Sequence, residues 1–313
     1  MMLTSPFSFD HTMRELFEYP DPSIPFVIWT GDFQTLAERS LVCHWHNEFE
    51  YGVLVSGSLD YYIDGKHIRV NKGDAIFINA NCMHMANQVG TDNVVIYTVS
   101  FLPSLFVGGN NSTLFQKYFQ PILQSSVKGF FIERKTTEGD AIVGLLQEIY
   151  TLANKQTENY ELLCISLISR IWCLTLQYIK QYKHEFFPFH TDHGNEQKAK
   201  EILSYIQEHY AEDIHIEDIA RHICISRSEC FRCFQRYVNT SPIAYLTEYR
   251  LSHAVNLLME TDKSMTQIAT ECGFSNSSYF GKIFKKKYAV TPLQFKNSLS
   301  TVGVRKTSYN NLV

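Results

Sequence analysis

The feature that most constrains this chain is an internal repeat of about fifty residues near its C-terminus. The first copy comprises residues 216–226, 227–237 and 241–245, and the second comprises residues 265–275, 276–288 and 291–295. Ala220 matches Ala269, Pro242 matches Pro292, and one extra residue follows Ser275 in the second copy. Because such a repeat marks one structural unit used twice, we expect two similar helical units within residues 198–298.

Each copy has the pattern of a helix-turn-helix. A small residue, Ala220 or Ala269, lies where a second helix would cross closely. Gly273 follows four residues later in the second copy and suits a tight turn, because glycine adopts left-handed backbone at little cost. Cys224 holds the same place in the first copy and is less suited to it. The pattern predicts a short helix, a turn and a second helix in each unit.

The second helix of each unit is expected to have a capped start, an apolar face and a polar face. Ser226 and Ser275 would cap these helices by accepting hydrogen bonds from unpaired backbone N–H groups. Cys230 and Cys233 have C-x-x-C spacing, but no second pair or nearby histidine pair completes a zinc site. We therefore place both cysteines in the core beside Phe234. Two hairpins that merely pack together do not explain the polar outer faces.

Charge is distributed unevenly along the chain. The net charge is −4, but residues 196–313 carry 15 Lys and Arg against 12 Asp and Glu, whereas residues 1–195 carry 13 against 20. This contrast is expected when only one part of a protein meets phosphate. Together with the repeat, it predicts that residues 198–298 bind double-stranded DNA at a promoter or operator.

The repeat resembles the arabinose-regulator (AraC/XylS) family of bacterial transcription regulators over the whole of residues 198–298. The residues that carry the resemblance are Ile268-Ala269, Gly273-Phe274, Ser278-Tyr279-Phe280, Phe284-Lys285, Thr291-Pro292-x-x-Phe295, and Tyr249-Arg250-Leu251 with Ala254 and Leu257-Leu258. The resemblance implies two recognition helices, joined by a long helix, that enter major-groove segments about 34 Å apart. It also implies contact with RNA polymerase and an activating role.

Carried over position by position, the resemblance implies DNA-contacting residues on both recognition helices. The base-facing candidates are Arg227, Ser228, Phe231 and Arg232 in the first unit, and Ser277, Ser278, Gly281 and Lys282 in the second. Arg232 is the strongest, because arginine pairs bidentately with guanine. Lys285, Lys286 and Lys287 are expected to meet phosphates, which give affinity without sequence information.

Two residues of the first unit depart from the family pattern. Phe231 stands where the family usually has a polar residue, and it either touches a thymine methyl group or is buried. Cys224 replaces the usual glycine at the turn. Glu229 is placed on the solvated edge of the helix rather than on a cytosine. We therefore expect the first unit to supply more specificity and the second more phosphate-driven affinity.

The remainder of the chain has two further patterns. Residues 25–101 alternate between apolar and polar side chains and contain turn signals, which indicates an antiparallel barrel or sandwich. Residues 112–183 have a helical period, and the second of their two apolar helices must be covered by the barrel or by a second subunit. We predict an α+β multidomain protein with five segments. These are a cupin-like β-barrel (1–105), a helical dimerisation region (106–183), a linker (184–197), the DNA-binding domain (198–298) and a tail (299–313).

A histidine constellation lies in the predicted barrel. His44, His46 and Glu50 resemble the first cupin motif, and His84 falls in a weaker match to the second. Histidines two residues apart on one strand point the same way. Three histidines and a carboxylate at this spacing suit a metal site.

Three roles for this constellation stay open. We favour a small-molecule site formed by His44, His46, Glu50, Tyr51 and His84 over a metal site or a purely structural role. Further candidates for the pocket lining are the aromatic residues Trp45, Phe49, Tyr61 and Phe77. Some of them must face away, because successive strand residues point to opposite faces. No cofactor is expected.

The leading interpretation is a ligand-responsive transcription regulator that acts as a homodimer and is not an enzyme, with sugars as the first effectors to test. One alternative is a cupin metalloenzyme or metal sensor fused to a DNA-binding module, and another is a regulator controlled by a protein partner. No apolar run approaches the ~20 residues of a membrane span, and the N-terminus has no signal pattern. We therefore expect a cytoplasmic protein without membrane contact.

Overall fold

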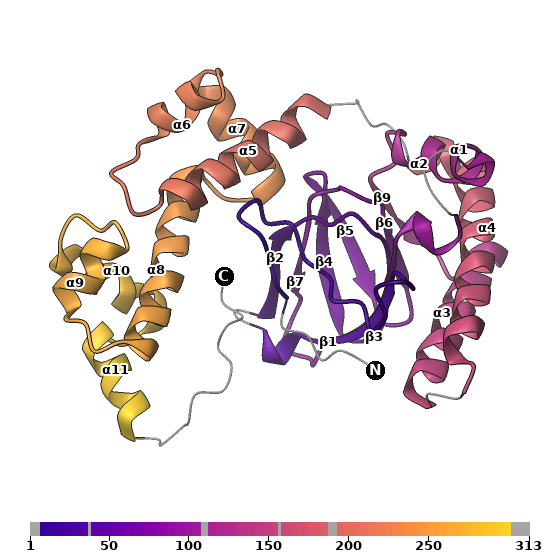
Figure 1. The fold of residues 1–313 in the computed structure, drawn as a ribbon, viewed down its shortest axis with the longest axis horizontal. Helices are drawn as coiled ribbons and strands as arrows, with labels where there is room; N and C mark the ends of the chain where they lie inside the picture. The colour runs from indigo at the N-terminus through magenta and orange to yellow at the C-terminus, as the bar shows by residue number, and fades with distance from the viewer. Residues whose placement is uncertain (1–6, 37–38, 108–111, 156–157, 187–192, 302–313) are drawn as a thin grey trace. The chain divides into compact units, whose positions relative to one another are not determined.

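The computed structural model describes residues 7–36, 39–107, 112–155, 158–186 and 193–301 of the 313-residue chain. The chain divides into two compact units, formed mainly by Arg14–His193 and Gly194–Val313 (Figure 1). The first unit combines β-sheets with helices, and the second is built from helices. The expected α+β fold class is therefore confirmed.

The N-terminal unit contains two antiparallel sheets. The five-stranded sheet has the order β1 (Phe26–Asp32), β8 (Val95–Phe101), β3 (Phe49–Ser56), β6 (Ala75–Ile78) and β9 (Gly129–Ile132). The four-stranded sheet has the order β2 (Ser40–His44), β7 (His84–Gln88), β4 (Ser58–Ile63) and β5 (Lys66–Asn71). Within the described residues the hydrogen-bonded strands form two separate antiparallel sheets, so of the two predicted arrangements, barrel and sandwich, the strand pairing is that of a sandwich.

The two sheets pack on one apolar core. Leu54, Ile76 and Ile96 of the five-stranded sheet meet Leu59 and Val70 of the four-stranded sheet, and all five are buried. The alternation of side chains along the strands sends one set of residues into this core and the other set away from it. The alternating pattern predicted for residues 25–101 therefore reflects strands whose side chains point to opposite faces of the five-stranded sheet.

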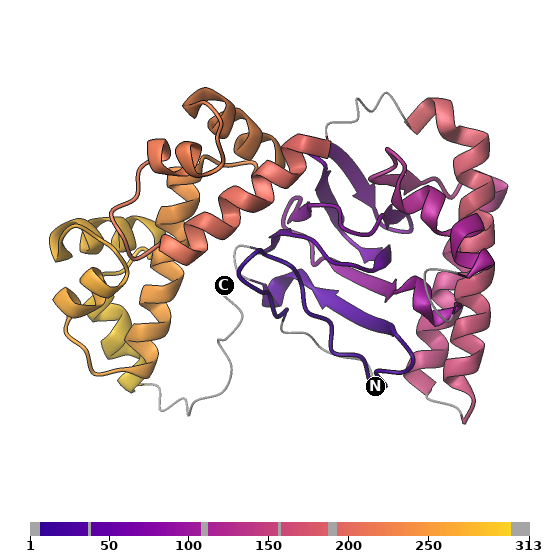
Figure 2. The same ribbon diagram turned by 45° about the horizontal axis from the view of Figure 1, so that its top comes forward.

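Helices cover the other face of the five-stranded sheet (Figure 2). They are α1 (Thr113–Tyr118), α2 (Gln120–Leu123), α3 (Thr137–Lys155) and α4 (Tyr160–Phe186), and short 3-10 helices lie at Phe33–Thr35 and Pro103–Leu105. Phe49 and Phe77 of the sheet contact Trp172 of α4, with ring centroids 4.5 Å and 6.3 Å away. The region predicted as purely helical also contains β9, which pairs with β6.

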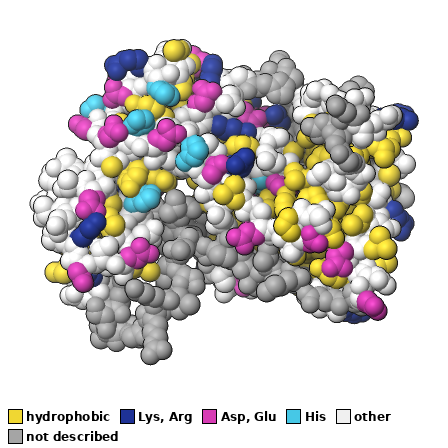
Figure 3. All heavy atoms as spheres, viewed as in Figure 1, with side chains coloured by type: hydrophobic (Ala, Val, Ile, Leu, Met, Phe, Trp, Pro, Cys, Tyr) yellow, Lys and Arg dark blue, Asp and Glu magenta, His cyan; other side chains and the backbone are white. Residues whose placement is uncertain are grey.

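By length and composition alone, the segment Tyr160–Tyr182 of α4 could cross a membrane, because an 18-residue window within it has a mean hydropathy of 1.6. The sequence predicted a long apolar helix in this region, but the expectation that no apolar stretch approaches the length of a membrane span does not hold for it. Leu167, Ile168 and Ile171 of this segment are buried in the core that α4 shares with the sheet. Packing against the sheet accounts for its apolar character, because a helix buried on one side needs an apolar stripe. Hydrophobic side chains also gather on the surface of the N-terminal unit (Figure 3).

The C-terminal unit is a series of helices. They are α5 (His193–His209), α6 (Ile216–His222), α7 (Arg227–Val238), α8 (Pro242–Glu260), α9 (Met265–Glu271), α10 (Ser277–Tyr288) and α11 (Pro292–Thr301). The pairs α6–α7 and α9–α10 are the two predicted helix-turn-helix units, and α8 is the expected long joining helix. Ser241 caps α8 and Pro242 occupies its first turn, a position that suits proline.

The segments between and after the units differ from their predicted bounds. The predicted linker, 184–197, overlaps the end of α4 and the beginning of α5, and its residues 187–192 lie outside the described residues. Helix α11 extends to Thr301, within the predicted tail, and residues 302–313 also lie outside the described part.

Candidate functional site

The turns of the two helix-turn-helix units share a left-handed residue. Cys224 has a φ of 55° and Gly273 has a φ of 74°. Only Gly273 is also crowded, because a Cβ atom there would lie 2.5 Å from the backbone oxygen of Tyr210. The sequence correctly placed both turns, and it correctly identified Cys224 as the less suitable residue for its conformation.

The two recognition helices are capped at equivalent positions. Ser226 caps α7, because its Oγ accepts a hydrogen bond from the Glu229 N–H at 3.1 Å. The predicted cap of α10 at Ser275 is wrong. Asn276 caps that helix, accepting from the Tyr279 N–H at 2.8 Å. The extra residue in the second copy lengthens the turn by one position and moves the cap with it.

The first recognition helix presents an exposed face. Arg227, Ser228, Phe231 and Arg232 are all exposed and line an open hollow beside α7. Phe231 is 46% exposed, which excludes the alternative that it is buried. Arg227 pairs with Glu217 at 2.9 Å, whereas no acidic side chain of the described residues pairs with Arg232.

The second recognition helix presents the corresponding positions. Ser278 and Lys282 are exposed, and Ser277 is half-buried. Tyr279 is 46% exposed beside them and was not among the predicted contacts, although its aromatic ring next to Ser278 was a signal in the sequence. This face is thus more polar and less rich in arginine than that of α7.

The lysines that end α10 are not equivalent. Lys285 and Lys286 are exposed, whereas the Lys287 ammonium lies 2.5 Å from the Glu248 carboxylate. Only the first two are therefore available to phosphates without breaking that ion pair. On α7, Glu229 pairs with Lys198 at 2.6 Å, so it lies at the edge of the helix as predicted.

The apolar faces of the recognition helices are buried as expected. Cys230, Cys233 and Phe234 are buried on α7, and Phe280 and Phe284 are buried on α10. The thiols of Cys230 and Cys233 therefore belong to the core of the first unit. Burial raises the pKa of Cys230 to about 11.

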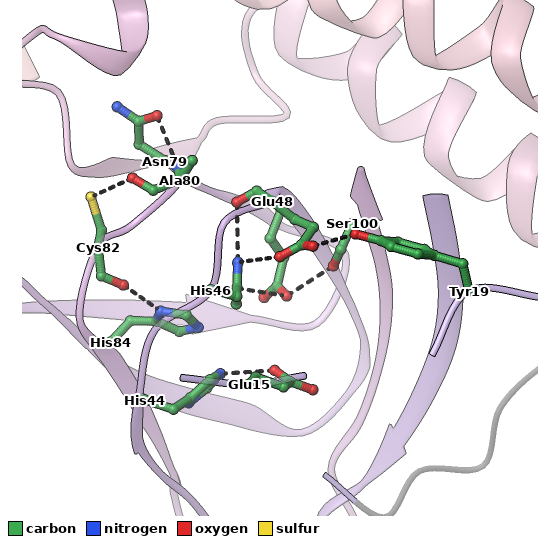
Figure 4. A network of polar contacts seen from close by, with 11 residues as sticks. Glu15, Tyr19, His44, His46, Glu48, Asn79, Ala80, Cys82, His84 and Ser100 are labelled. Atoms are coloured by element: carbon green, nitrogen blue, oxygen red, sulfur yellow. Dashed lines mark hydrogen bonds and ion pairs between the residues drawn. The ribbon is translucent and has the colours of Figure 1, made fainter. Parts of the chain in front are cut away.

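A second candidate site is the histidine cluster of the N-terminal unit (Figure 4). His44 ends β2 and pairs in register with His84, which begins β7, and His46 follows two residues after His44. One ligand atom from each of these three side chains lies within 4.8 Å of the other two. All three residues are buried. The predicted convergence of His44, His46 and His84 is thus present in the structure.

Buried carboxylates surround the three imidazoles. Glu50 of β3 lies 3.4 Å from His46 Nε2, and its carboxylate accepts a hydrogen bond from Ser100 at 3.1 Å. Glu15 lies 3.3 Å from His44 Nε2. The sequence did not indicate Glu15, because its N-terminal segment reaches the cluster only through backbone pairing beside Trp45.

Burial and neighbouring charges shift the pKa values of the clustered histidines and glutamates in different directions. Burial lowers the pKa of His44 to about 4 and raises that of Glu15 to about 8. Burial also disfavours the charged forms of His46 and Glu50, but their mutual interaction outweighs it. The interaction between His46 and Glu50 raises the pKa of His46 to about 8 and lowers that of Glu50 to about 2. Such divergent values in one enclosed cluster are typical of a binding or functional site.

The aromatic residues predicted to line this site are mostly elsewhere. Tyr51 follows Glu50 on β3 and therefore points to the opposite face, where its hydroxyl shares a hydrogen bond of 2.7 Å with Thr175 of α4. The predicted role of Tyr51 beside the histidines is thus corrected. Phe49 and Phe77 also face the helices, whereas Tyr61 lies in the core between the sheets.

Comparison with known proteins assigns a family domain to each of the two units. The family model for an AraC-like ligand binding domain matches residues 32–171, and the model for a helix-turn-helix domain matches residues 219–298. The fold and its sites thus define a DNA-binding transcriptional regulator with an N-terminal ligand-binding domain. The chain belongs to the AraC family of transcriptional regulators.

Relatives span most of the chain. This chain is 26% identical to the HTH-type transcriptional regulator YdeC of Bacillus subtilis over 291 residues. The matched region covers 93% of this chain and 98% of the relative. The chain is 22% identical over 271 residues to the melibiose operon regulatory protein of Escherichia coli, with 81% and 82% covered. Among solved structures, an AraC-type transcriptional regulator from Chromobacterium violaceum is 31% identical, with a TM-score of 0.33, covering 36% of this chain and 100% of that chain.

Proposed function

We propose that this protein is a transcription activator whose activity at a promoter is controlled by a small molecule bound in its N-terminal unit. The observation that carries the DNA-binding part is the pair of matched, exposed faces on α7 and α10. Each recognition helix begins at a capped residue that follows a left-handed turn, so the cap and the turn fix the position of the helix and its exposed face. Rigid helices of this kind suit the major groove of DNA.

The residues of the two faces divide into base readers and phosphate contacts. Arg232 is the principal base reader, because its guanidinium is exposed and has no acidic partner among the described residues. Arg227 is the second, and it must leave Glu217 to reach a base. Lys285 and Lys286 supply phosphate contacts on the second unit. The first unit therefore contributes more of the sequence specificity.

The effector site is the buried polar cluster between the sheets. Its three histidines and Glu50 lie inside the segment matched by the AraC-like ligand binding domain, and Glu15 lies before that segment. The melibiose operon regulatory protein carries a sugar in its name, so sugars and sugar phosphates are the first effectors to test. A ligand changes transcription only if it binds one arrangement of the protein better than another.

Substitution of Arg232 by Ala tests the DNA-binding role. Loss of a bidentate contact to guanine costs about 1–3 kcal/mol, so affinity for the promoter should fall about 5- to 150-fold. Fluorescence anisotropy with a labelled promoter fragment measures this change. Affinity for non-specific DNA should change much less, because phosphate contacts remain.

Arg170→Ala is the matched control, because Arg170 is an exposed arginine on α4 of the other unit. That variant should bind the promoter like the wild type. Full sequence-specific binding by Arg232→Ala would show that α7 does not read bases through this residue. Loss of binding by both variants would indicate a general charge effect instead.

A further inference from the structure

The three imidazoles of the histidine cluster make the same kind of backbone contact through Nδ1. The Nδ1 atoms of His44, His46 and His84 lie 2.8, 3.0 and 3.0 Å from the backbone oxygens of Val42, Glu48 and Cys82. A backbone oxygen only accepts, so each Nδ1 carries the proton and donates it. The remaining ring nitrogen, Nε2, approaches the Glu15 carboxylate in His44 and the Glu50 carboxylate in His46 (Figure 4).

Two of the three Nε2 atoms have no hydrogen bond within the described part of the chain. His46 Nε2 and His84 Nε2 are buried and make no hydrogen bond with any described residue. His46 Nε2 has only the 3.4 Å approach to the Glu50 carboxylate. Buried polar atoms without hydrogen bonds cost free energy unless another group satisfies them. Two such atoms in one cluster indicate a ligand at their common centre.

The carboxylates are positioned to complete that centre. The Glu50 carboxylate is held by Ser100, which faces it across β3 and β8, and it approaches His46. The Glu15 carboxylate approaches His44 from the other side. Glu48 is also buried and lies 3.9 Å from His46, so carboxylate oxygens stand beside the imidazoles as further donors for a cation.

We propose that the N-terminal unit binds a divalent transition-metal ion of the zinc class through the Nε2 atoms of His44, His46 and His84 and the carboxylate of Glu50. Imidazole nitrogen and carboxylate oxygen are suitable donors for Zn²⁺ and related ions. A tetrahedral zinc with bonds of about 2.0–2.1 Å holds its nitrogens about 3.4 Å apart. One ring nitrogen from each histidine lies within 4.8 Å of the other two, so the rings must move closer together when the ion binds.

The backbone contacts favour an ion over a purely structural network. Metal-binding histidines characteristically donate the second ring N–H to a carbonyl or carboxylate, which fixes the ring and its tautomer. Here all three rings do so. A purely structural network would be expected to supply a partner for His84 Nε2, which has none among the described residues.

This inference deepens the proposed function, and only the regulatory role of the ion rests on that function. An ion in this place lies in the proposed effector site, where it would be the effector or would bind a polar group of the effector. Binding of the ion itself requires no DNA. The two proposals can therefore fail separately.

Cobalt substitution of the full-length protein tests the site. The protein is treated with a chelator, dialysed, and titrated with Co²⁺ while its visible absorption spectrum is recorded. We expect one Co²⁺ per chain, with d–d bands typical of nitrogen and oxygen ligands, and loss of these bands when Zn²⁺ is added. His84→Gln and Glu50→Gln should each weaken binding at least tenfold.

His67→Gln is the matched control, because His67 is an exposed histidine of the same unit that pairs with Asp60 outside the cluster. It should bind Co²⁺ like the wild type. Equal binding by the wild type, His84→Gln and Glu50→Gln, or no stoichiometric binding by the wild type, would overturn the proposal. If His84→Gln does not fold, Glu50→Gln and the wild-type spectrum still decide between these outcomes.

Promoter binding by the same samples separates the two proposals. Stoichiometric Co²⁺ with no sequence-specific DNA binding would reject the proposed function and keep the metal site. Intact promoter binding without bound Co²⁺ would do the reverse. A change in promoter affinity on addition of Zn²⁺, absent in His84→Gln and present in His67→Gln, would assign a regulatory role to the ion.

Discussion

At the scale of single residues, Gly273 has two independent reasons to be glycine. Its φ of 74° is left-handed, and an added Cβ atom would meet the backbone oxygen of Tyr210. Left-handed backbone alone costs other residues about 1–2 kcal/mol. We expect Gly273→Ala to lower the free energy of unfolding by about 2 kcal/mol or more, because the contact adds to that cost. Urea unfolding followed by circular dichroism measures the change.

Cys224 provides the opposite substitution at the equivalent turn. It adopts a φ of 55° without being glycine. Cys224→Gly relieves a conformational cost of about 1–2 kcal/mol but adds flexibility to the unfolded chain that costs about 0.5–1 kcal/mol. We therefore expect a net stabilisation of about 0.5–1 kcal/mol in the same urea experiment. If Gly273→Ala and Cys224→Gly shifted stability in the same direction, the assignment of these turns would be wrong.

Residue positions were predictable from the sequence where local geometry decides them. Ser226 and the two turns follow from the repeat alone, because a cap and a left-handed turn are local features. The cap at Asn276 was missed by one position, because a one-residue insertion can lengthen the turn on either side of Ser275. Tyr51 was misplaced for another reason. Alternation shows that Tyr51 and Glu50 face opposite ways, but in a two-sided sheet both faces are buried.

At the scale of elements, α10 is expected to contribute affinity without specificity. Lys285 and Lys286 are exposed on its last turns, whereas Lys287 is occupied by Glu248. Each lysine that neutralises a phosphate steepens the plot of log affinity against log salt concentration by about 0.9. We expect Lys285→Ala and Lys286→Ala each to reduce that slope by about 1 and to weaken promoter and non-specific DNA equally. Anisotropy titrations over a range of salt concentrations measure both quantities.

Lys287→Ala is the control for this prediction. Its ammonium already pairs with Glu248, so its removal should leave the salt dependence close to that of the wild type. A selective loss of promoter binding in Lys285→Ala or Lys286→Ala would instead place that lysine on a base edge.

Elements with a strong period were predictable, and a short strand inside a helical stretch was not. Helices α6 to α10 follow from the repeat, and α3 and α4 follow from their apolar stripes. Strand β9 spans only Gly129–Ile132, and its few apolar residues fit a strand or a buried helix equally. Its pairing with β6 is a long-range contact that local sequence does not encode.

At the scale of the whole molecule, the candidate metal-binding cluster was predictable in part. His44, His46, Glu50 and His84 were found by their spacing on predicted strands. Glu15 was not, because backbone pairing beside Trp45 brings a distant N-terminal segment to the cluster. The sequence did not distinguish a barrel from a sandwich for a related reason. Strand alternation gives the faces of a sheet but does not show whether its edges join.

The helices of the N-terminal unit retain an apolar surface that a second copy of the chain would cover. Most of the apolar stripe of α4 packs against the five-stranded sheet, but Leu162 and Leu163 at its start are 70% and 44% exposed. We expect these leucines to lie in the dimer interface and Leu162→Glu with Leu163→Glu to give a monomer, because a buried unpaired carboxylate is costly. Sedimentation velocity at several protein concentrations measures the association state. Leu293→Glu, at an exposed leucine of α11, should leave the dimer intact. A double variant that still dimerises, or a wild type that is monomeric throughout, would show that this surface has another role.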